Sequence, residues 1–565
     1  MIYKTLHWYI LRELIRIFLL TASALSILLA FGGTLKPLTK QGIPVFQLML
    51  VLLNGMAAMV AYAFPLAALF AAVLVYWRLS TDNEVTACRA SGVSFLTILF
   101  PAFILGLGVA SADLMCVNFV VPMFTQRMER IVRSDIGAIL VSQISRQEAF
   151  EYNRMLVVYA DGAISEVVSG ADLSPEDRQR GVTSQTRATL HGMAAIEQGR
   201  EKPNVVAAAK TAYVIIDELA DRDEVQLRVI TQDGAGYQFD TFNKVSGERA
   251  TLPPNGEPLT IPSPTKNRPK FLNYLQLSAL SHDPLLHPDL SSIMTDIKRV
   301  WTHQQIAQHI GAMFRAHPRE PVVFHSADSD QVVVNAPDVG FDPEGNVVFR
   351  AIPGSTVRVD EYQDKKLVTY YKCDGVRVTL NEGDPGTGIG LQTRAVLEMA
   401  GNGERLDVNQ GRRSPFTSQI IQPLQLPAGV PIAFDWDGPR NDILNHPEAY
   451  SPAIAGMVRD LKDGMTKLFQ SITSEFHSRA SFALSCLALV LLGAALGIIM
   501  RGKNPLLVFV IGFVPALVLI LLIIAGRRMV EDASGGIAFG LGIVWAGNVL
   551  LLGLVAGVYA KLLRS

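Results

Sequence analysis

A short polar stretch, RLSTDNEVTACRASGVSF, lies between two long apolar runs and carries a strong local signal. Thr81 followed by Glu84 fits the S/T-x-x-E capping box, in which the threonine oxygen accepts a hydrogen bond from the N–H of residue 84 and the glutamate accepts one from residue 81. Asp82 adds negative charge at the positive end of a helix dipole, and Gly92 supplies a left-handed stop. The pattern predicts a short, capped helix where a loose turn would be enough to join the two runs.

The predicted helix spans about 82–91, and its period places Val85 and Cys88 on one side. Arg89 adds a positive charge close to a membrane boundary. A helix of about ten residues is marginal when it is alone in water. We therefore expect it to pack against its own membrane helices or against a partner on the same side of the membrane.

Three of the ionisable residues in or beside the apolar runs are candidates for a function. Asp113 lies in the third run, where the rise of a helix places it close to one hydrated membrane interface. Lys36 and Lys40, at the end of the first run, are expected at a similar depth. Two interpretations of the lysines stay open: their ammonium groups reach out to the interface, or they form a cationic site for an anionic lipid head group.

Signatures of catalysis, nucleotide binding and metal binding are missing from the sequence. It has no G-x-x-x-x-G-K-[ST] motif, and the glycine-rich GDPGTGIG at 383–390 indicates a surface turn because no lysine follows it into a helix. Six histidines fall between His282 and His325, without H-E-x-x-H spacing or a cysteine pair beside them. The net charge of -1 also lacks the basic excess of a nucleic-acid surface. We expect no catalytic residue, and no cofactor or metal bound by this chain.

Six apolar runs are each long enough to cross a hydrocarbon core of about 30 Å. They lie at about 15–35, 50–77, 95–121, 480–500, 506–525 and 535–562. An even number of spans places both termini on the same side, and a slight excess of Lys and Arg at the helix ends indicates that this side is the cytoplasm. The capped helix is then cytoplasmic, and the large insert between the third and fourth runs lies outside.

The insert, 134–476, is mostly β structure by its pattern, because short runs rich in Val, Ile and Tyr alternate with turn signals. Two stretches, near 170–203 and 253–321, indicate insertions into this β framework, the second of them partly helical. The predicted fold class is an α-helical membrane protein with six transmembrane helices. Three of them lie in 1–133 and three in 477–565, on either side of a large, mainly β, jelly-roll-like domain.

Four sequence blocks occur in order across the six runs: YILRELIRIFLLT, RLSTDNEVTACRASGVSFLTILFP, EFHSRASFALSCLALVLLGAALGIIMR and VWAGNVLLL. Together they resemble the LptF/LptG (YjgP/YjgQ) family of lipopolysaccharide-export permeases, and the second block is the most specific. The resemblance covers roughly the first 130 and the last 100 residues. Over the insert, which is about twice the family's usual length, only position and β character match.

This resemblance implies a multi-pass protein in the inner membrane of a Gram-negative-type bacterium, with a periplasmic jellyroll between two sets of three helices. It also implies an assembly with a paralogous LptF/LptG permease, a cytoplasmic LptB-like ATPase dimer that binds ATP and Mg, an LptC-like single-span protein and an LptA-like periplasmic bridge. Such an assembly extracts lipopolysaccharide from the inner membrane and passes it to the bridge.

The resemblance also implies roles for two groups of residues. The family's coupling helix, which docks in a groove of the ATPase, maps onto the capped helix, and the family's coupling glutamate maps onto Glu84. The residues assigned to this helix are Asp82, Glu84, Val85, Cys88, Arg89 and Gly92. Basic residues that contact lipid A phosphates in family members map onto Lys36 and Lys40.

Alternatives stay open on the sequence. One is a mechanotransmission permease of the ATP-binding-cassette class that acts on another lipid or on a lipoprotein, and another is a membrane-anchored periplasmic scaffold without transport. The sequence does not decide between an LptF-like and an LptG-like member, although the two lysines slightly favour the latter. It also leaves open what the enlarged insert does, and whether Glu84 caps its helix, couples to a partner, or does both.

Overall fold

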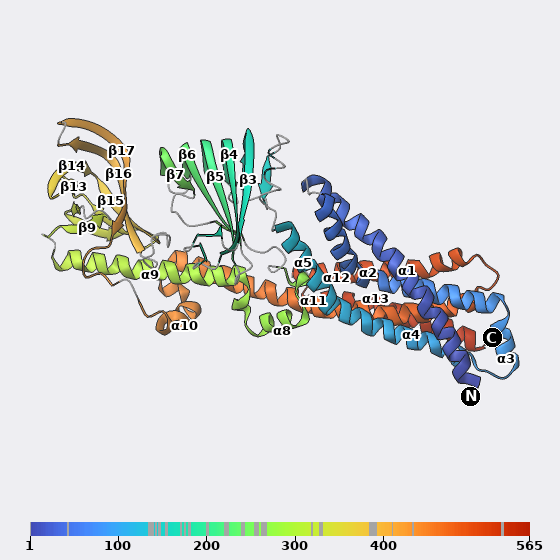
Figure 1. Ribbon diagram of the computed structural model, residues 1–565. Helices are drawn as coiled ribbons and strands as arrows, with labels where there is room; N and C mark the ends of the chain where they lie inside the picture. The colour runs from blue at the N-terminus through green and yellow to red at the C-terminus, as the bar shows by residue number, and fades with distance from the viewer. Residues whose placement is uncertain are drawn as a thin grey trace.

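The computed structural model of the protein divides into a bundle of long helices and two β-sheets carried on further helices (Figure 1). It describes residues 2–41, 45–133, 141, 144, 149–152, 156–169, 172–174, 177–178, 182–198, 203–219, 225–238, 243–252, 259–261, 268–317, 320–326, 331–382, 393–408, 411–431, 434–532 and 536–564. The glycine-rich stretch 383–390, expected to be a surface turn, lies outside these residues.

Six helices in the described chain are long and apolar enough to cross a membrane, which confirms the predicted spans. They are α1 (Ile2–Gln41), α2 (Val45–Thr81), α4 (Phe95–Met115), α11 (Pro452–Ile499), α12 (Pro505–Glu531) and α13 (Ile537–Arg564). Large apolar side chains such as Leu107 and Leu521 are more than half exposed, as expected on surfaces that face lipid. Both termini lie at the same end of the bundle, away from the sheets (Figure 1).

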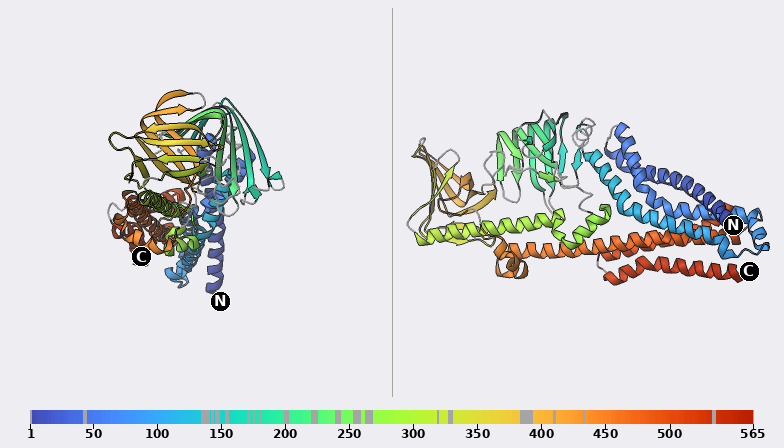
Figure 2. Two further views of the ribbon diagram at one scale, coloured as in Figure 1. Left: turned by 90° about the vertical axis from the view of Figure 1, so that its left-hand side faces the viewer. Right: turned by 60° about the horizontal axis from the view of Figure 1, so that its bottom comes forward.

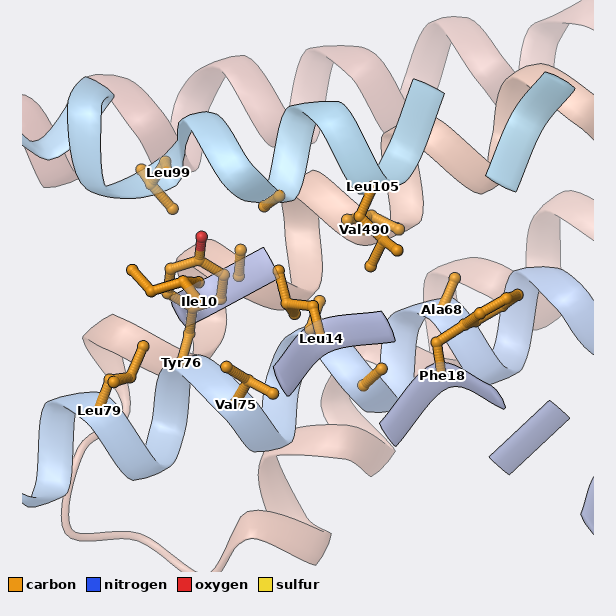
Figure 3. Close-up of a cluster of buried hydrophobic side chains, with 14 of the residues drawn as sticks. Ile10, Leu14, Phe18, Ala68, Val75, Tyr76, Leu79, Leu99, Leu105 and Val490 are labelled. Atoms are coloured by element: carbon orange, nitrogen blue, oxygen red, sulfur yellow. The ribbon is translucent and has the colours of Figure 1, made fainter. Parts of the chain in front are cut away.

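The core of the bundle joins the two halves of the chain. Leu14 of α1, Tyr76 of α2, Leu105 of α4 and Val490 of α11 belong to one buried cluster, drawn in Figure 3. The Tyr76 hydroxyl, which would be costly to bury unpaired, donates to the Ile98 carbonyl at 2.9 Å. This cluster fixes α2 and α4, the helices on either side of the short polar stretch, against α11.

Glycines let α11 approach α2 very closely. A Cβ atom at Gly493 would lie 2.9 Å from the Leu69 carbonyl oxygen, and one at Gly497 would lie 2.8 Å from the Val73 carbonyl oxygen. Small residues at such contacts are the usual way for helices to pack in lipid, where hydrophobic burial between helices contributes little. The two helices therefore meet backbone to backbone over this part of the bundle.

The β region consists of two antiparallel sheets. The first contains β1 (Phe150–Tyr152), β2 (Leu156–Tyr159), β3 (Gly162–Ser169), β4 (Val182–Gln198), β5 (Pro203–Leu219), β6 (Val225–Gln238), β7 (Asn243–Leu252) and β8 (Leu259–Ile261). Its order is β1-β2-β4-β5-β6-β7, while β3 also pairs with β4 and β8 with β6. All of these pairs are antiparallel.

The second sheet contains β9 (Val322–Ser326), β10 (Gln331–Asn335), β11 (Asp338–Phe341), β12 (Val347–Arg350), β13 (Val357–Gln363), β14 (Lys366–Cys373), β15 (Gly375–Glu382), β16 (Thr393–Asp407) and β17 (Arg412–Gln425). Its order is β11-β12-β15-β16-β14-β13-β10-β9-β17, and β17 also pairs with β16, so part of the sheet closes on itself. The fold class of three helices, a large antiparallel β region and three more helices is thus confirmed. The narrower expectation of a jelly roll stays a prediction.

The insertion expected near 170–203 is wrong over 182–198, because these residues form β4. This strand pairs with β3, β2 and β5 and is central to the first sheet. Its alternate residues Thr186, Ala188 and Leu190 are buried. The sequence hid this strand because residues such as Gln185 and Ala188 occupy buried positions where a strand usually carries Val or Ile.

The stretch 253–321 is largely helical. It contains β8, the 3-10 turns η3 (Pro269–Phe271) and η4 (Pro284–Leu286), and the helices α8 (Tyr274–His282) and α9 (Pro288–Ala316). Both sheets lie on one side of α9 (Figure 1), and α9 packs against the outer part of α11 through buried residues such as Trp301 and Val458. The small helix α10 (Asp437–Asn445) adds Ile443 to the same cluster.

Helix α11 connects the sheets to the far end of the bundle. Its 48 residues form one continuous helix, about 70 Å long at 1.5 Å per residue. Figure 2 shows it running from α10 and α9 through the bundle towards the end that holds both termini. A displacement at one end of this helix therefore reaches the other end without passing through a loop.

Candidate functional site

The short helix between α2 and α4 is α3 (Glu84–Ala90), and it begins later than predicted. Helix α2 continues to Thr81, and the N–H of Asp82 still bonds the Arg78 carbonyl at 2.9 Å. The residue before α3 is Asn83, which has a left-handed φ of 61° and no side-chain capping bond. The predicted capping box is therefore wrong, and so are the boundaries 82–91.

The physical reason lies in α2. Leu79 and Ser80 are still buried, and the Ser80 hydroxyl donates to the Ile498 carbonyl of α11 at 3.2 Å. Because this packing holds α2 helical through its last turn, Thr81 is in a helix and cannot act as the N-cap of the next one. A left-handed asparagine, rather than a capping threonine, turns the chain into α3.

The end of α3 is as predicted. Gly92 has a φ of +86°, which an L side chain rarely adopts. Its N–H bonds the Arg89 carbonyl at 2.9 Å, and the N–H of Val93 bonds the Cys88 carbonyl at 3.1 Å. These two bonds form a Schellman motif, which satisfies carbonyls at the end of the helix. The predicted glycine stop is confirmed.

Of the two expected packing partners, the structure shows the chain's own bundle. Val85 is 6% exposed and belongs to the core cluster, and Cys88 packs against that cluster. The Arg89 guanidinium lies 4.0 Å from the centre of the Phe95 ring, at the start of α4. Asp82 and Thr86 are exposed and Glu84 is partly exposed. One face of α3 is therefore anchored, and the other is available to a partner.

A groove of about 730 Å³ lies beside α3. Arg89 of α3, Arg501 after α11 and Lys561 of α13 all line it. Arg501 Nη1 lies 3.4 Å from Thr86 Oγ1, so the turn after α11 also contacts α3. The groove thus brings positive charge from three separate segments to the same end of the bundle.

The predicted lipid-contact residues lie at the opposite end. Lys36 and Lys40 belong to the last turns of α1, which runs towards the side of the sheets (Figure 1). Their side chains lie outside the described part of the chain, and their contact with lipid stays a prediction. Asp113 is fully buried among the helices, and within the described residues neither of its carboxyl oxygens has a hydrogen-bond partner. Its depth relative to the membrane interface stays a prediction.

The histidines between 282 and 325 have separate surroundings. His282 Nδ1 lies 2.7 Å from the Ser278 carbonyl, and the His309 ring packs on Phe434. Within the described residues, no group of three or more His, Cys, Asp or Glu side chains is placed to hold a metal ion.

A buried ion network at the end of the bundle nearer the sheets was not predicted. Glu475 and Arg479 of α11 are 3% and 4% exposed, and Arg479 Nε lies 3.2 Å from Glu475 Oε2. The other Glu475 oxygen pairs with Arg527 of α12, whose Nε also lies 2.9 Å from Glu531 Oε1. Two carboxylates and two guanidinium groups balance in charge, which buried ions require. The signal in the sequence was the i, i+4 pair in SEFHSRAS, just before an apolar run.

Arg479 also joins the membrane helices to the chain that follows the first sheet. Its Nη2 donates to the carbonyls of Pro269, Lys270 and Leu272, at 3.4, 3.3 and 2.9 Å. The Phe271 carbonyl accepts from Gln126 Nε2 at 3.1 Å. Four consecutive carbonyls, 269–272, therefore accept hydrogen bonds from side chains of the bundle. We call Arg479, Gln126 and segment 269–272 the latch.

The latch also contacts an irregular turn in the membrane. Arg479 Nη1 donates to Asn118 Oδ1 at 3.2 Å, and Asn118 lies in the π-helix η1 (Cys116–Val120) that follows α4. Gln126 lies in α5 (Val121–Arg133), the helix after η1. Single π-helical turns are found often at functional sites, because the extra residue can shift a helix in register. η1, α5, α11 and α12 thus all meet at the latch and its ion network.

Comparison with known proteins identifies the family. The family model described as lipopolysaccharide export system permease LptF/LptG matches residues 8–309 and 336–561. The chain belongs to the LptF/LptG family. As a member, it is a multi-pass inner-membrane permease, a transporter subunit of the lipopolysaccharide export system. None of the curated proteins compared with the chain matches it.

The LptF/LptG match extends further than the sequence blocks indicated. It includes both sets of membrane helices, α3 and the latch, and also most of the β region. The interval without a match, 310–335, holds the last turns of α9 together with β9 and β10. Most of the insert therefore belongs to the family's own architecture.

Proposed function

We propose that this chain is the permease subunit through which a separate cytoplasmic ATPase dimer drives lipopolysaccharide out of the inner membrane. Three observations support this: the family, the anchored helix α3 at one end of the bundle, and the latch at the other. ATP and Mg bind to the ATPase and not to this chain. A paralogous LptF/LptG permease, an LptC-like protein and an LptA-like jellyroll bridge complete the assembly.

The substrate explains why outside energy is needed. Moving a lipid with several acyl chains from the bilayer into water costs about 0.8 kcal/mol of free energy for each CH₂ group. The sequence has no P-loop with which to bind ATP. Extraction therefore needs a partner that hydrolyses ATP and a rigid element that receives its motion.

Helix α3 is suited to that role because its position is fixed. Val85 anchors it in the core, the Schellman motif at Gly92 ends it, and Arg89 stacks on Phe95. Asp82, in the turn before α3, is exposed, and Glu84, the first residue of α3, is partly exposed, so this face is accessible. We assign that face to the ATPase, with Glu84 as the residue that pairs with a basic group of the partner.

Helix α11 provides a continuous route from α3 to the sheets. The Ser80 hydroxyl, in the last turn of α2, donates to the Ile498 carbonyl near the α3 end of α11. Arg479, further along the same helix, holds carbonyls of 269–272. Motion of α3 would thus tilt α2 and α11 together and move the latch, and through it the chain that carries α8, α9 and the sheets. Lys36 and Lys40 would meet the lipid A phosphates at the outer end of α1.

The observation that carries the proposal is the exposed face of an otherwise anchored α3. The experiment is purification of the full chain in mild detergent, followed by identification of co-purifying proteins and lipids. We expect an ATPase subunit, a second permease and lipopolysaccharide. Co-purification of another lipid or a lipoprotein with the ATPase would favour a different cargo, and the absence of any ATPase would contradict the proposal.

A further inference from the structure

The groove beside α3 has a charge that nothing in its own lining neutralises. Arg89, Arg501 and Lys561 line it, and among the described residues of its lining there is no Asp or Glu. The three cations come from α3, from the turn after α11 and from the last turn of α13. Convergence of three like charges on one groove costs electrostatic energy, which an anion in the groove would offset.

Most of the remaining lining of the groove is apolar, and Ser80 and Thr86 add two hydroxyl groups. Phe95, Ile498, Ile499 and Leu562 contribute to its wall, and Ile499 is 39% exposed. A volume of about 730 Å³ is far more than one carboxylate or one phosphate ion would fill. The groove therefore suits a ligand that has both a negatively charged group and an apolar part.

Its depth in the membrane indicates the same kind of ligand. Arg501 directly follows the membrane helix α11, and Lys561 lies in the last turn of α13. These are the positions where lysine and arginine side chains meet lipid head groups. Basic grooves between transmembrane helices at the cytoplasmic side commonly bind acidic lipid heads.

We infer that this groove is a binding site for one anionic phospholipid of the leaflet at the α3 end, with its phosphate among Arg89, Arg501 and Lys561 and its first acyl carbons against the apolar wall. Such a lipid would hold α3 to the ends of α11 and α13. The groove shares α3 with the residues assigned to the ATPase, but neither Asp82 nor Glu84 lines it. The inference does not depend on which cargo the protein transports.

Native mass spectrometry of the detergent-purified full-length chain tests this site without the ATPase. The probes are dioleoylphosphatidylglycerol and dioleoylphosphatidylcholine, which have the same acyl chains and differ in net charge. The variant is Arg501→Gln with Lys561→Gln, which leaves α3 unaltered. The matched control is Lys503→Gln with Arg564→Gln, which removes two exposed positive charges at the same end that do not line the groove.

We expect one phosphatidylglycerol to be retained more strongly than phosphatidylcholine, about tenfold weaker retention in the Arg501/Lys561 variant, and no change in the control pair. Equal retention of the two lipids, or an unaffected Arg501/Lys561 variant, would overturn the inference. Displacement of the lipid by inorganic phosphate at equal concentration would show a site for a simple anion. In a separate pull-down with the ATPase, loss of association in that variant, together with unchanged lipid retention, would show a protein-docking surface, and the lipid assignment would then be wrong.

Discussion

Arg479 donates to the Leu272 carbonyl at 2.9 Å across 207 residues of sequence. The same guanidinium pairs with Glu475 and contacts Asn118 of the π-helix. A single side chain thus fixes an ion network of the membrane helices to the chain that leads from one sheet to the other. Arginine suits this position because its planar group carries five donors, whereas lysine presents a compact ammonium.

Arg479→Lys is expected to lower transport while the protein still folds. The lysine keeps the charge beside Glu475 but cannot reach several carbonyls at once, so the protein folds and hydrolysis by the partner continues while lipopolysaccharide release falls. Arg479→Gln leaves the buried carboxylate with less compensation and should destabilise the bundle by about 3 kcal/mol. Thermal unfolding, ATPase rate and release from proteoliposomes are the measurements. Arg459→Lys, on an exposed position of the same helix, is the control. Equal loss of hydrolysis and release in Arg479→Lys would contradict a role in the latch.

Glu84→Gln is expected to leave stability unchanged, within about 0.5 kcal/mol, because no capping box depends on this side chain. If Glu84 pairs with a basic group of the ATPase, hydrolysis in the complex and lipid release both decrease. Thr81→Ala is the matched control: a true N-cap would lose about 1 kcal/mol, and we expect no loss. A drop in melting temperature for Thr81→Ala would restore the capping interpretation, whereas Glu84→Gln cannot do so because glutamine also completes a capping box.

Gly92→Ala tests the stop of α3. Alanine at a φ of +86° is strained, so we expect a loss of about 1 kcal/mol and faster hydrogen exchange in α3. If α3 receives the motion of the partner, ATPase coupling declines as well. Gly108→Ala in α4 is the control, because nothing lies within 4 Å of its added Cβ and its φ is not positive. Unaltered exchange in α3 would argue that the left-handed stop is dispensable.

His303 of α9 is expected to give the stability of this region a pH dependence. Burial, with a smaller contribution from Arg299, lowers the pKa of His303 from its usual value to about 4. Between pH 6.5, the usual pKa of histidine, and about pH 4, the unfolded chain binds a proton that the folded chain does not. The free energy of unfolding therefore falls as the pH falls from about 6.5 towards 4. His303→Gln should reduce the loss of melting temperature between pH 7 and pH 5, as measured by circular dichroism. The exposed His282→Gln is the control. An equal acid sensitivity of the His303 variant and the unmodified protein would exclude this assignment.

The sequence by itself determined the features that depend on local pattern. The six spans follow from runs of apolar residues, the β region from alternating β-branched residues, and the stop of α3 from Gly92, which a left-handed position requires. The ordered sequence blocks were also enough to indicate the family that the comparison shows.

Only the tertiary structure decided where those elements begin and which distant residues meet. Helix α2 extends through Thr81 because Ser80 bonds α11, a contact between residues 418 positions apart. The same holds for Arg479, whose partners at 269–272 lie in a different part of the chain. A capping motif or an i, i+4 ion pair consists of residues that are close together in the sequence. Whether it forms depends on the burial and the hydrogen bonds that tertiary packing supplies.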